Sequence, residues 1–438
     1  MQVPNGLNTN LDLSSLNGSN GFAINGSGTN SSGTSVSNAG DINGDNLDDL
    51  IIGAPGATLG TGQSYVVFGS ISTFNASLDL SSLDGSNGFA INGINDSTGD
   101  RIPDSSGKSV SSAGDVNGDG IDDLIIGAPS AVSGAGQSYV VFGSTNGFNA
   151  SLDLSSLDGS NGFAINGSDT DSAGNSVSNA GDVNNDGIDD LIIGAQGTGK
   201  SYVVFGSTSA FNASFDLSSL NGSNGFVING NTTDFSGASV SNAGDVNNDD
   251  IDDLIIGAYN ADSGAGKSFV VFGSTNGFNA NLDLSNLDSS NGFAINGING
   301  NDSSGYSVSA AGDVNDDDIA DLIIGAPFAA SGAGQSYVVF GSSSGFNANL
   351  DLSNLDESQG FAINGINSTD SLGISVSAAG DINGDGADDL LVGASGASLG
   401  AGQSYVIFGT PQPEPELQPE PQPEPQPQPE PQPLETNK

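Results

Sequence analysis

The sequence contains no histidine, no cysteine and no tryptophan, and only 5 of its 438 residues are lysine or arginine. Without histidine and cysteine there can be no Ser-His-Asp or Cys-His nucleophile, no His/Cys zinc site, no histidine-ligated haem and no disulfide. With 52 acidic residues the formal net charge is -47, which opposes binding to nucleic acid or to an anionic lipid surface. Carboxylates, hydroxyls and a few amines are therefore the groups left for catalysis.

Long apolar runs are also missing. No stretch approaches the ~20 residues of a membrane-spanning helix, so we expect no direct membrane insertion. Residues 1–10 have neither the basic start nor the apolar segment of a signal peptide. The apolar residues, 35% of the chain, fall in short clusters such as Leu50-Ile51-Ile52 and Val66-Val67-Phe68. Such clustering predicts a folded body despite the high acidity.

The chain contains six copies of one unit. The segment that begins at Ala39-Gly40-Asp41 returns at residues 113, 180, 243, 311 and 379, at intervals of 63 to 74 residues. The variation in length falls in an insertion around residues 100–103 and in a short loop at residues 196–200. Length changes confined to loops are typical of a repeated scaffold.

Each unit has four short strand-like runs separated by Gly, Ser, Asn and Asp clusters. In the first unit they are 34–37, 49–53, 64–69 and 88–92, and the two middle runs are apolar throughout. No window has a sustained helical period. The pattern predicts an all-β fold, a β-propeller of six four-stranded antiparallel blades over residues 1–410, with seven blades as the alternative.

The two ends of this region suggest how the ring closes. The chain begins with a spare fourth strand at residues 21–25, whereas the last unit ends at its third strand, residues 404–409. We expect these strands to pair and remove an open sheet edge. Residues 411–438 hold 11 of the 16 prolines and predict a disordered or polyproline II tail, either a spacer or a solvated end without a partner.

The strongest chemical signal is a nine-residue segment between the first and second runs of every unit. Its first copy is residues 41–49, and positions 1, 3, 5 and 9 are Asp, Asn, Asp and Asp in all six copies. These oxygen donors suit a hard cation such as calcium, and an apolar residue at position 7 can add its carbonyl oxygen. Positions 4 and 6 are always Gly, Asn or Asp, the residues that best tolerate a left-handed backbone.

The sequence thus predicts about one calcium ion per repeat, up to six. The predicted metal-binding residues are Asp41, Asn43, Asp45, Leu47, Asp49, Asp115, Asn117, Asp119, Ile121, Asp123, Asp182, Asn184, Asp186, Ile188, Asp190, Asp245, Asn247, Asp249, Ile251, Asp253, Asp313, Asn315, Asp317, Ile319, Asp321, Asp381, Asn383, Asp385, Ala387 and Asp389.

Charge supports this interpretation, because three aspartates in one turn repel one another unless a cation or protonation neutralises them. The alternative is an ordinary Asp/Asn/Gly turn without a metal. An EF-hand is excluded, because position 12 is Ile52 where that motif requires glutamate. The aspartates at position 8, such as Asp48, point away from the ligand set and are interpreted as solvated or supporting residues. The strand aromatics, such as Tyr65, are expected in the core.

These residues resemble the FG-GAP repeats of integrin α-subunit propellers and their bacterial relatives. The resemblance covers residues 1–409 and rests on six Phe-Gly pairs such as Phe68-Gly69, on Gly-Ala-Pro at 53–55, 127–129 and 325–327, and on the acidic loop. Gly-Ala is followed by Gln196, Tyr259 or Ser395 in the other units, and integrin propellers have seven blades. The resemblance implies calcium in hairpin loops and ligand recognition at another face of the disc.

We therefore expect a non-enzymatic, calcium-binding adhesion or recognition module located outside the cell or on its surface, where calcium is abundant. Its partner would be a protein or glycan on a loop face, and the module would be a monomer. A purely structural surface scaffold is the first alternative. A calcium-assisted polysaccharide hydrolase or lyase is the second, and it is disfavoured because six equivalent loops do not make one asymmetric acid pair.

Overall fold

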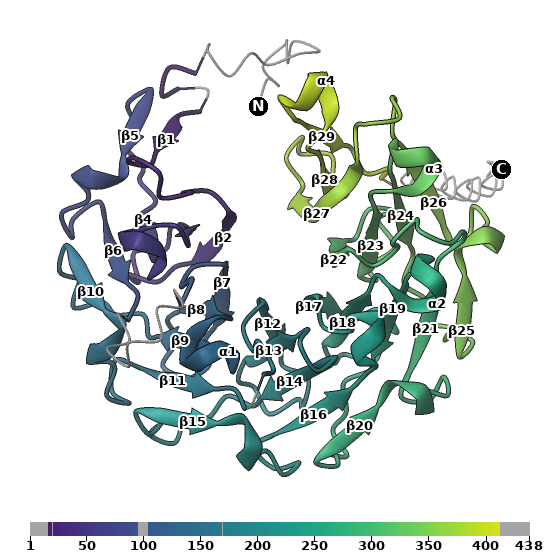
Figure 1. Ribbon diagram of the computed structural model, residues 1–438, viewed down its shortest axis with the longest axis horizontal. Helices are drawn as coiled ribbons and strands as arrows, with labels where there is room; N and C mark the ends of the chain where they lie inside the picture. The colour runs from purple at the N-terminus through teal and green to yellow at the C-terminus, as the bar shows by residue number, and fades with distance from the viewer. Residues whose placement is uncertain (1–15, 20, 95–103, 169, 412–438) are drawn as a thin grey trace, which may run out of the picture.

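The protein is an all-β ring of small sheets, a six-bladed β-propeller (Figure 1). The computed structural model describes residues 16–19, 21–94, 104–168 and 170–411. Residues 1–15, the insertion at 100–103 and the tail from residue 412 lie outside the described residues. Six blades are found, and not the alternative of seven.

The blades repeat one order of strands from the axis outward. The first blade contains β2 (Ser35–Gly40), β3 (Asp49–Ala54), β4 (Gln63–Val67), β6 (Gly88–Asn92) and β10 (Ser151–Asp153). The second contains β7 (Ser109–Gly114), β8 (Asp123–Ala128), β9 (Gln137–Val141), β11 (Gly162–Asn166) and β15 (Ser214–Asp216). The third contains β12 (Ser176–Gly181), β13 (Asp190–Ala195), β14 (Lys200–Val204), β16 (Gly225–Asn229) and β20 (Asn281–Asp283).

The remaining sheets follow the same order. The fourth blade contains β17 (Ser239–Gly244), β18 (Asp253–Ala258), β19 (Lys267–Val271), β21 (Gly292–Asn296) and β25 (Asn349–Asp351). The fifth contains β22 (Ser307–Gly312), β23 (Asp321–Ala326), β24 (Gln335–Val339) and β26 (Gly360–Asn364). The sixth contains β27 (Leu372–Gly380), β28 (Asp389–Ala394) and β29 (Gln403–Ile407), and a separate pair contains β1 (Ala23–Asn25) and β5 (Ser77–Asp79).

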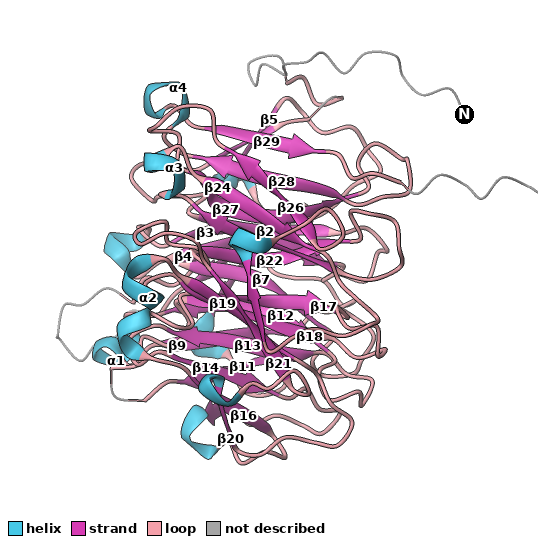
Figure 2. Cartoon of the chain, turned by 90° about the vertical axis from the view of Figure 1, so that its right-hand side faces the viewer, coloured by secondary structure: helices cyan, strands magenta, loops and turns pink. Residues whose placement is uncertain are grey.

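The described helices are single turns in the connections and lie mostly along one side of the disc (Figure 2). The α-helical turns are α1 (Ala131–Gly134), α2 (Ala261–Gly264), α3 (Ala329–Gly332) and α4 (Ala397–Gly400). The 3₁₀ turns are η2 (Thr58–Gly60), η3 (Leu80–Ser82), η4 (Leu154–Ser156), η5 (Leu217–Ser219), η6 (Thr232–Asp234), η7 (Leu284–Asn286) and η8 (Leu352–Asn354). No helix among the described residues is long and apolar enough to cross a membrane.

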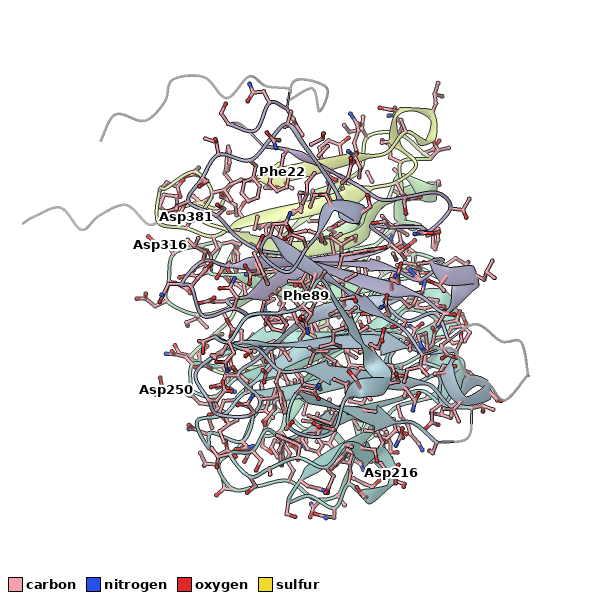
Figure 3. All side chains as sticks on the ribbon, turned by 90° about the vertical axis from the view of Figure 1, so that its left-hand side faces the viewer. Phe22, Phe89, Asp216, Asp250, Asp316 and Asp381 are labelled. Atoms are coloured by element: carbon pink, nitrogen blue, oxygen red, sulfur yellow. The ribbon has the colours of Figure 1, made fainter. Side chains whose placement is uncertain are left out.

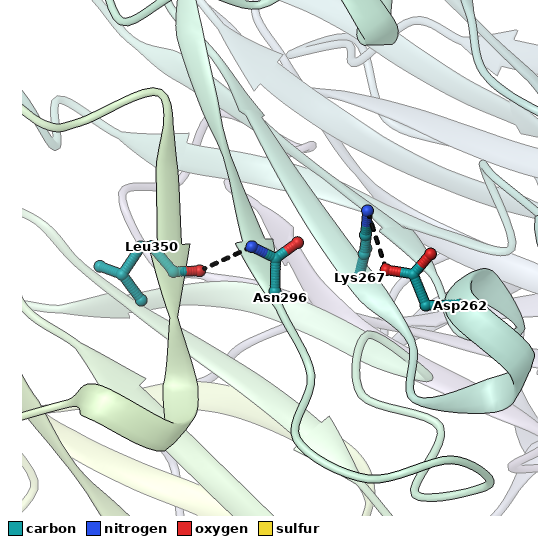
Figure 4. Close-up of polar contacts among 4 residues, drawn as sticks. All are labelled: Asp262, Lys267, Asn296 and Leu350. Carbon is teal, nitrogen blue, oxygen red and sulfur yellow. Dashed lines mark hydrogen bonds and ion pairs between the residues drawn. The ribbon is translucent and has the colours of Figure 1, made fainter.

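Four blades carry a fifth strand that was not predicted. Each is a three-residue strand that pairs in parallel with the fourth strand of the preceding repeat, as β25 does with β21. Asn296 of β21 donates a side-chain hydrogen bond to the carbonyl of Leu350 in β25, 3.4 Å away (Figure 4). In the same blade Lys267 forms an ion pair with Asp262 at 2.9 Å. The outermost strand of a blade is thus supplied by the next repeat.

The core lies between neighbouring blades. All six residues of β8 and of β13 are buried, so these apolar strands are covered on both faces. Phenylalanines close the core toward the rim: Phe89 stacks on Phe148 with ring centroids 4.3 Å apart, and Phe68 of the first Phe-Gly pair lies tilted against both. The phenylalanine of the Phe-Gly motif makes ring contacts in the first five blades and so has a packing role there.

The predicted pairing of the N-terminal strand with residues 404–409 is not present. β1 instead pairs in parallel with β5, and Phe22 stacks on Phe74 at 4.3 Å. Because β5 and this aromatic contact hold β1 beside the first repeat, β29 pairs only with β28 among the described strands. The two incomplete sheets, of two and three strands, lie on the two sides of an opening in the ring at the top of Figure 1, which we call the seam.

Side chains at this seam are less covered than their equivalents elsewhere. Val36 is 67% exposed and Leu50 41%, whereas the equivalent Val110 and Leu124 in the second blade are 4% and 0% exposed. On the other side of the seam Val406 is 46% exposed. Among the described strands, each other pair of neighbouring blades is in close contact through its innermost strands, whereas β2 and β27 on the two sides of the seam are not.

Deleting residues 1–30 tests the contribution of β1 to the stability of the ring. The deletion removes the β1–β5 pairing and the Phe22–Phe74 stack, so we expect the melting temperature to fall by about 5 °C or more. Thermal unfolding followed by circular dichroism measures the change. Deletion of residues 412–438 is the control and should leave the melt in place. An unchanged melt for the first deletion would show that β1 is not part of the cooperative fold.

Candidate metal centre

The six acidic segments connect the first and second strands of the six blades, and we number them loops 1 to 6 in chain order. They begin at Asp41, Asp115, Asp182, Asp245, Asp313 and Asp381, and each second strand starts at position 9. Asp250, Asp316 and Asp381 mark the face of the disc on which these loops lie (Figure 3). The single-turn α-helices lie at the opposite ends of the strands. The structure thus places the predicted sites on one face.

The aspartate at position 1 organises the turn. In loop 2 the carboxylate of Asp115 accepts hydrogen bonds from the backbone N–H groups of Asp119 at 3.0 Å and Gly120 at 2.7 Å. The same pair of bonds occurs in all six loops. Positions 4 and 6 are left-handed as predicted, including the non-glycine pair Asp316 (φ 58°) and Asp318 (φ 65°) in loop 5.

The aspartate at position 9 is buried and ties the loop to the Phe-Gly pair. In loop 2 Asp123 accepts hydrogen bonds from the backbone N–H of Gly143 at 2.9 Å and of Val116 at 3.1 Å. Gly143 has no space for a side chain, because an added Cβ would lie 2.3 Å from the carbonyl oxygen of Asp122. The glycine of the Phe-Gly motif therefore lets the third strand approach the acidic loop.

Burial of the position-9 carboxylates raises the pKa of Asp123, Asp190 and Asp253 to about 8, the pKa of Asp321 to about 7 and the pKa of Asp49 to about 6. The charges at positions 5 and 1 of the same loop push each pKa further up, while backbone hydrogen bonds act in the opposite direction. In loops 1 to 5 the neighbouring aspartates thus oppose ionisation of the carboxylate at position 9, and a bound cation would relieve this opposition.

The asparagine at position 3 fits the role of an oxygen ligand. Asn117 donates its Nδ2 to the carboxylate of Asp123 at 3.3 Å, and so keeps its Oδ1 for another partner. In loop 5 the Oδ1 of Asn315 is buried and has no hydrogen-bond partner. A buried acceptor without a donor costs free energy, and a hard cation would satisfy it.

The remaining predicted ligands fit in type, although their side chains are not gathered around one point. No group of three or more acidic side chains within the described ranges has the close grouping of a metal cluster. The carboxylates at positions 1 and 5 are turned toward backbone N–H groups, as Asp119 is toward the N–H of Ile121 at 3.1 Å. The residues at position 7 are half-buried in most loops and buried at Ile251 and Ala387. Each loop thus offers three carboxylates, an amide oxygen and a nearby backbone carbonyl.

The aspartates at position 8 have a role that the sequence did not reveal. Four of them accept the backbone N–H of position 1 in the preceding blade: Asp122 from Asp41 at 2.8 Å, Asp189 from Asp115 at 2.9 Å, Asp252 from Asp182 at 3.0 Å, and Asp388 from Asp313 at 3.0 Å. We call these four the bridging aspartates.

The surroundings of Asp189 show that the bridging aspartates follow one another around the ring. Burial raises the pKa of Asp189 despite the hydrogen bond from Asp115, and the charges of Asp252 and Asp122 add to the rise. The fifth unit has Ala320 at this position. The only sequence signal was the recurrence of aspartate at position 8, because its partner lies in another repeat.

The opposite face carries a cavity of 630 Å³. Its lining includes Pro55, Pro129 and Gln196, the residues that follow Gly-Ala in the first three units, together with Lys108 and Phe235. Gln196 donates a hydrogen bond to the hydroxyl of Tyr259 at 3.1 Å. Four aromatic rings lead away from the cavity with centroids 5.2 to 6.0 Å apart, in the order Phe235, Tyr259, Tyr306 and Phe328.

The strand aromatics have the predicted packing role. Tyr65, Tyr139, Tyr202 and Tyr337 are all buried. Their hydroxyl groups reach polar partners, as Tyr139 does with the side-chain oxygen of Gln137 at 2.7 Å. These tyrosines are therefore core residues and not a ligand surface.

Comparison with known proteins identifies the repeat. The family model FG-GAP repeat matches residues 32–67, 106–141, 173–204, 304–339 and 372–407. The corresponding part of the fourth unit lies between the third and fourth matched ranges. Integrin alpha-4 of Xenopus laevis is 30% identical over 159 residues, which cover 34% of this chain and 14% of that protein. The chain thus corresponds to a small part of that relative's length.

A solved DUF4623 family protein from Bacteroides eggerthii DSM 20697 covers 83% of this chain and 68% of its own, at 10% identity and a TM-score of 0.36. That likeness is too low to bear on function. The repeat match and the ring of sheets together confirm an FG-GAP repeat propeller similar to those of integrin alpha subunits.

Proposed function

We propose that the protein is a non-enzymatic, calcium-binding recognition module that acts outside the cell or on its surface. The observation that carries the proposal is the recurrence of one donor set, three aspartates and an asparagine, in six loops on one face of the propeller. Oxygen donors of this kind suit calcium, and modules with such sites load at the roughly 10⁻⁴–10⁻³ M calcium of extracellular fluids.

The opposite face supports a role in ligand recognition. The cavity of 630 Å³ and the adjoining aromatic rings combine apolar faces with amide and hydroxyl groups, the usual make-up of a binding site. Phe235 and Phe328 are 36% and 47% exposed, and exposed aromatic side chains that are grouped on a surface mark interaction sites. A protein or glycan ligand would bind here, away from the metal loops.

Calcium binding is tested by equilibrium dialysis with millimolar calcium and by thermal melts with and without EDTA. We expect up to six ions per chain and a lower melting temperature in EDTA. Asp41→Ala should remove one ion from the stoichiometry, and Glu357→Gln, which removes an exposed charge outside the loops, should remove none. Absence of bound calcium together with an unchanged melt in EDTA would contradict the proposal.

Ligand binding is tested on glycan arrays and on immobilised extracellular proteins. We expect binding by the calcium-loaded protein and its loss in the double variant Phe235→Ala/Phe328→Ala, whose metal loops are unchanged. Retention of binding by this variant would place the ligand elsewhere. Failure of the wild-type protein to bind any probe would favour the structural scaffold, and release of sugar fragments would favour the hydrolase or lyase.

A further inference from the structure

The bridging aspartates connect residues that the calcium proposal assigns to different sites. Asp189 stands between Ile188, whose carbonyl is a predicted ligand in loop 3, and Asp190, the buried carboxylate of the same loop. Its own carboxylate holds the backbone N–H of Asp115, the first predicted ligand of loop 2, at 2.9 Å. A shift of loop 3 on binding an ion would therefore move the backbone of the first ligand in loop 2.

The fit at this contact leaves little freedom. Gly114, directly before Asp115, has φ +67°, and a Cβ added to it would lie 2.2 Å from the carboxylate of Asp189. The glycine before position 1 is equally close to a bridging carboxylate at three other junctions. The pairs are Gly40 with Asp122, Gly181 with Asp252, and Gly312 with Asp388. The absence of a side chain here lets the aspartate of one blade reach the backbone of the next.

A second inter-blade bond holds the other side of each loop. The backbone N–H of Ser207 in the third blade donates to the carbonyl of Val116 in loop 2 at 2.9 Å. Equivalent bonds join Ser144 to Ile42, Ser274 to Val183, Ser342 to Val246 and Thr410 to Val314. This backbone bond needs no particular side chain, so it occurs at all five of these junctions.

The junction between loops 4 and 5 has the backbone bond but lacks the side-chain bridge. Ala320 occupies position 8 in loop 5, and its Cβ faces Gly244 with no carboxylate to accept the N–H of Asp245. The bond from Ser342 to Val246, at 2.8 Å, is retained. The backbone N–H of Ala320 also donates to the carbonyl of Asp245 at 3.3 Å. This junction therefore keeps backbone bonds between the two loops but has no side-chain bridge, which makes it a natural comparison within the chain.

From these contacts we propose that the bridging aspartates couple calcium binding between neighbouring loops, so that loops 1 to 4 form one coupled group and loops 5 and 6 a second. The proposal rests on the proposed function, since it concerns how the same six sites communicate. Within a group, a calcium ion bound in one loop holds the bridging aspartate of that loop in place. The bridging aspartate in turn holds the first ligand of the preceding loop in place, so that the preceding loop binds its own calcium ion more tightly. Between loops 4 and 5 this side-chain link is missing, and the two loops are joined by backbone bonds.

Amide hydrogen exchange of the full chain, measured by mass spectrometry at increasing free calcium, gives a separate loading midpoint for each loop. In Asp189→Ala we expect the loop 2 midpoint to rise on the order of tenfold, while loops 5 and 6 stay at wild-type values. Without calcium, the backbone amide of Asp115 should also exchange faster in Asp189→Ala than in the wild-type protein. Asp189→Asn keeps a hydrogen-bond acceptor, so its loop 2 midpoint should stay close to the wild-type value. Glu357→Gln serves as the charge control.

The reverse variant, Ala320→Asp, adds the missing bridge and does not depend on a destabilised protein. We expect it to lower the midpoint of loop 4 toward those of loops 1 to 3. If the wild-type loops gain protection with calcium but neither variant moves the midpoint of its preceding loop, the coupling is wrong and the calcium sites stand. If no loop of the wild-type protein responds to calcium, the proposed function itself fails.

Discussion

Replacing Asp190 by alanine is expected to lower the free energy of unfolding by about 3–5 kcal/mol. This carboxylate is fully buried and accepts hydrogen bonds from the backbone N–H of Gly206 at 2.9 Å and of Val183 at 3.2 Å. Its removal leaves both donors buried without an acceptor and opens the contact between loop 3 and the Phe-Gly pair. Urea unfolding of wild type and variant measures the difference.

Two control variants separate the structural role of Asp190 from its role toward calcium. Asp186→Ala in the same loop removes an exposed carboxylate and should cost less than about 1 kcal/mol in EDTA. Asp190→Asn resembles the protonated acid, so it should keep most of the stability in EDTA but gain less from added calcium than the wild type. Equal stability of Asp190→Ala and wild type in EDTA would show that the buried bonds are not important.

The second large effect concerns pH. In EDTA we expect the melting temperature to rise by about 10 °C or more when the pH is lowered from 8 to 5. Burial raises the pKa of Asp123 and Asp190 to about 8, well above the ordinary value near 3.8. Between these values the folded protein binds more protons than the unfolded chain, so its stability increases as the pH falls and is lost as the pH rises toward 8.

Calcium should weaken or reverse this trend, because a bound cation favours the ionised carboxylates that protons would otherwise neutralise. Thermal melts at four pH values, each with EDTA and with calcium, give the two slopes. Asp190→Asn removes one titrating group and should flatten the EDTA slope, whereas Glu357→Gln should leave it unchanged. A melting temperature in EDTA that falls on acidification would contradict the assignment of the raised pKa values.

Much of the fold follows from the sequence because the repeat imposes one solution six times. The run at 49–53 became β3 and the run at 88–92 became β6, since apolar strands bounded by Gly and Asp have few alternative structures. The three-residue strands such as β10 were not predicted, because three residues are too few to show a sequence period and the strand with which each pairs lies in the preceding repeat. The closing pair was wrong for a related reason, since β1 had a competing partner in β5.

For the acidic loops, the sequence predicted the left-handed backbone at positions 4 and 6, because ligand spacing and backbone freedom point to the same turn. It did not predict that the aspartate at position 9 is buried. It could not predict that Asp122 reaches the backbone of Asp41, because that contact joins two blades. Residues that act within one turn leave a local pattern, whereas residues that act between repeats do so only through their three-dimensional neighbours. The calcium ligands themselves remain a prediction.

The borrowed outer strand has a consequence for how such a protein can change in length. Because β10 completes the sheet of the first blade but belongs to the second repeat, a cut between two blades separates a strand from its sheet. Adjacent repeats therefore overlap, because each supplies a strand to the sheet of the one before it. A stretch of chain can be duplicated or lost without disrupting a sheet only if its length is that of a whole repeat, wherever in the repeat the breakpoints fall.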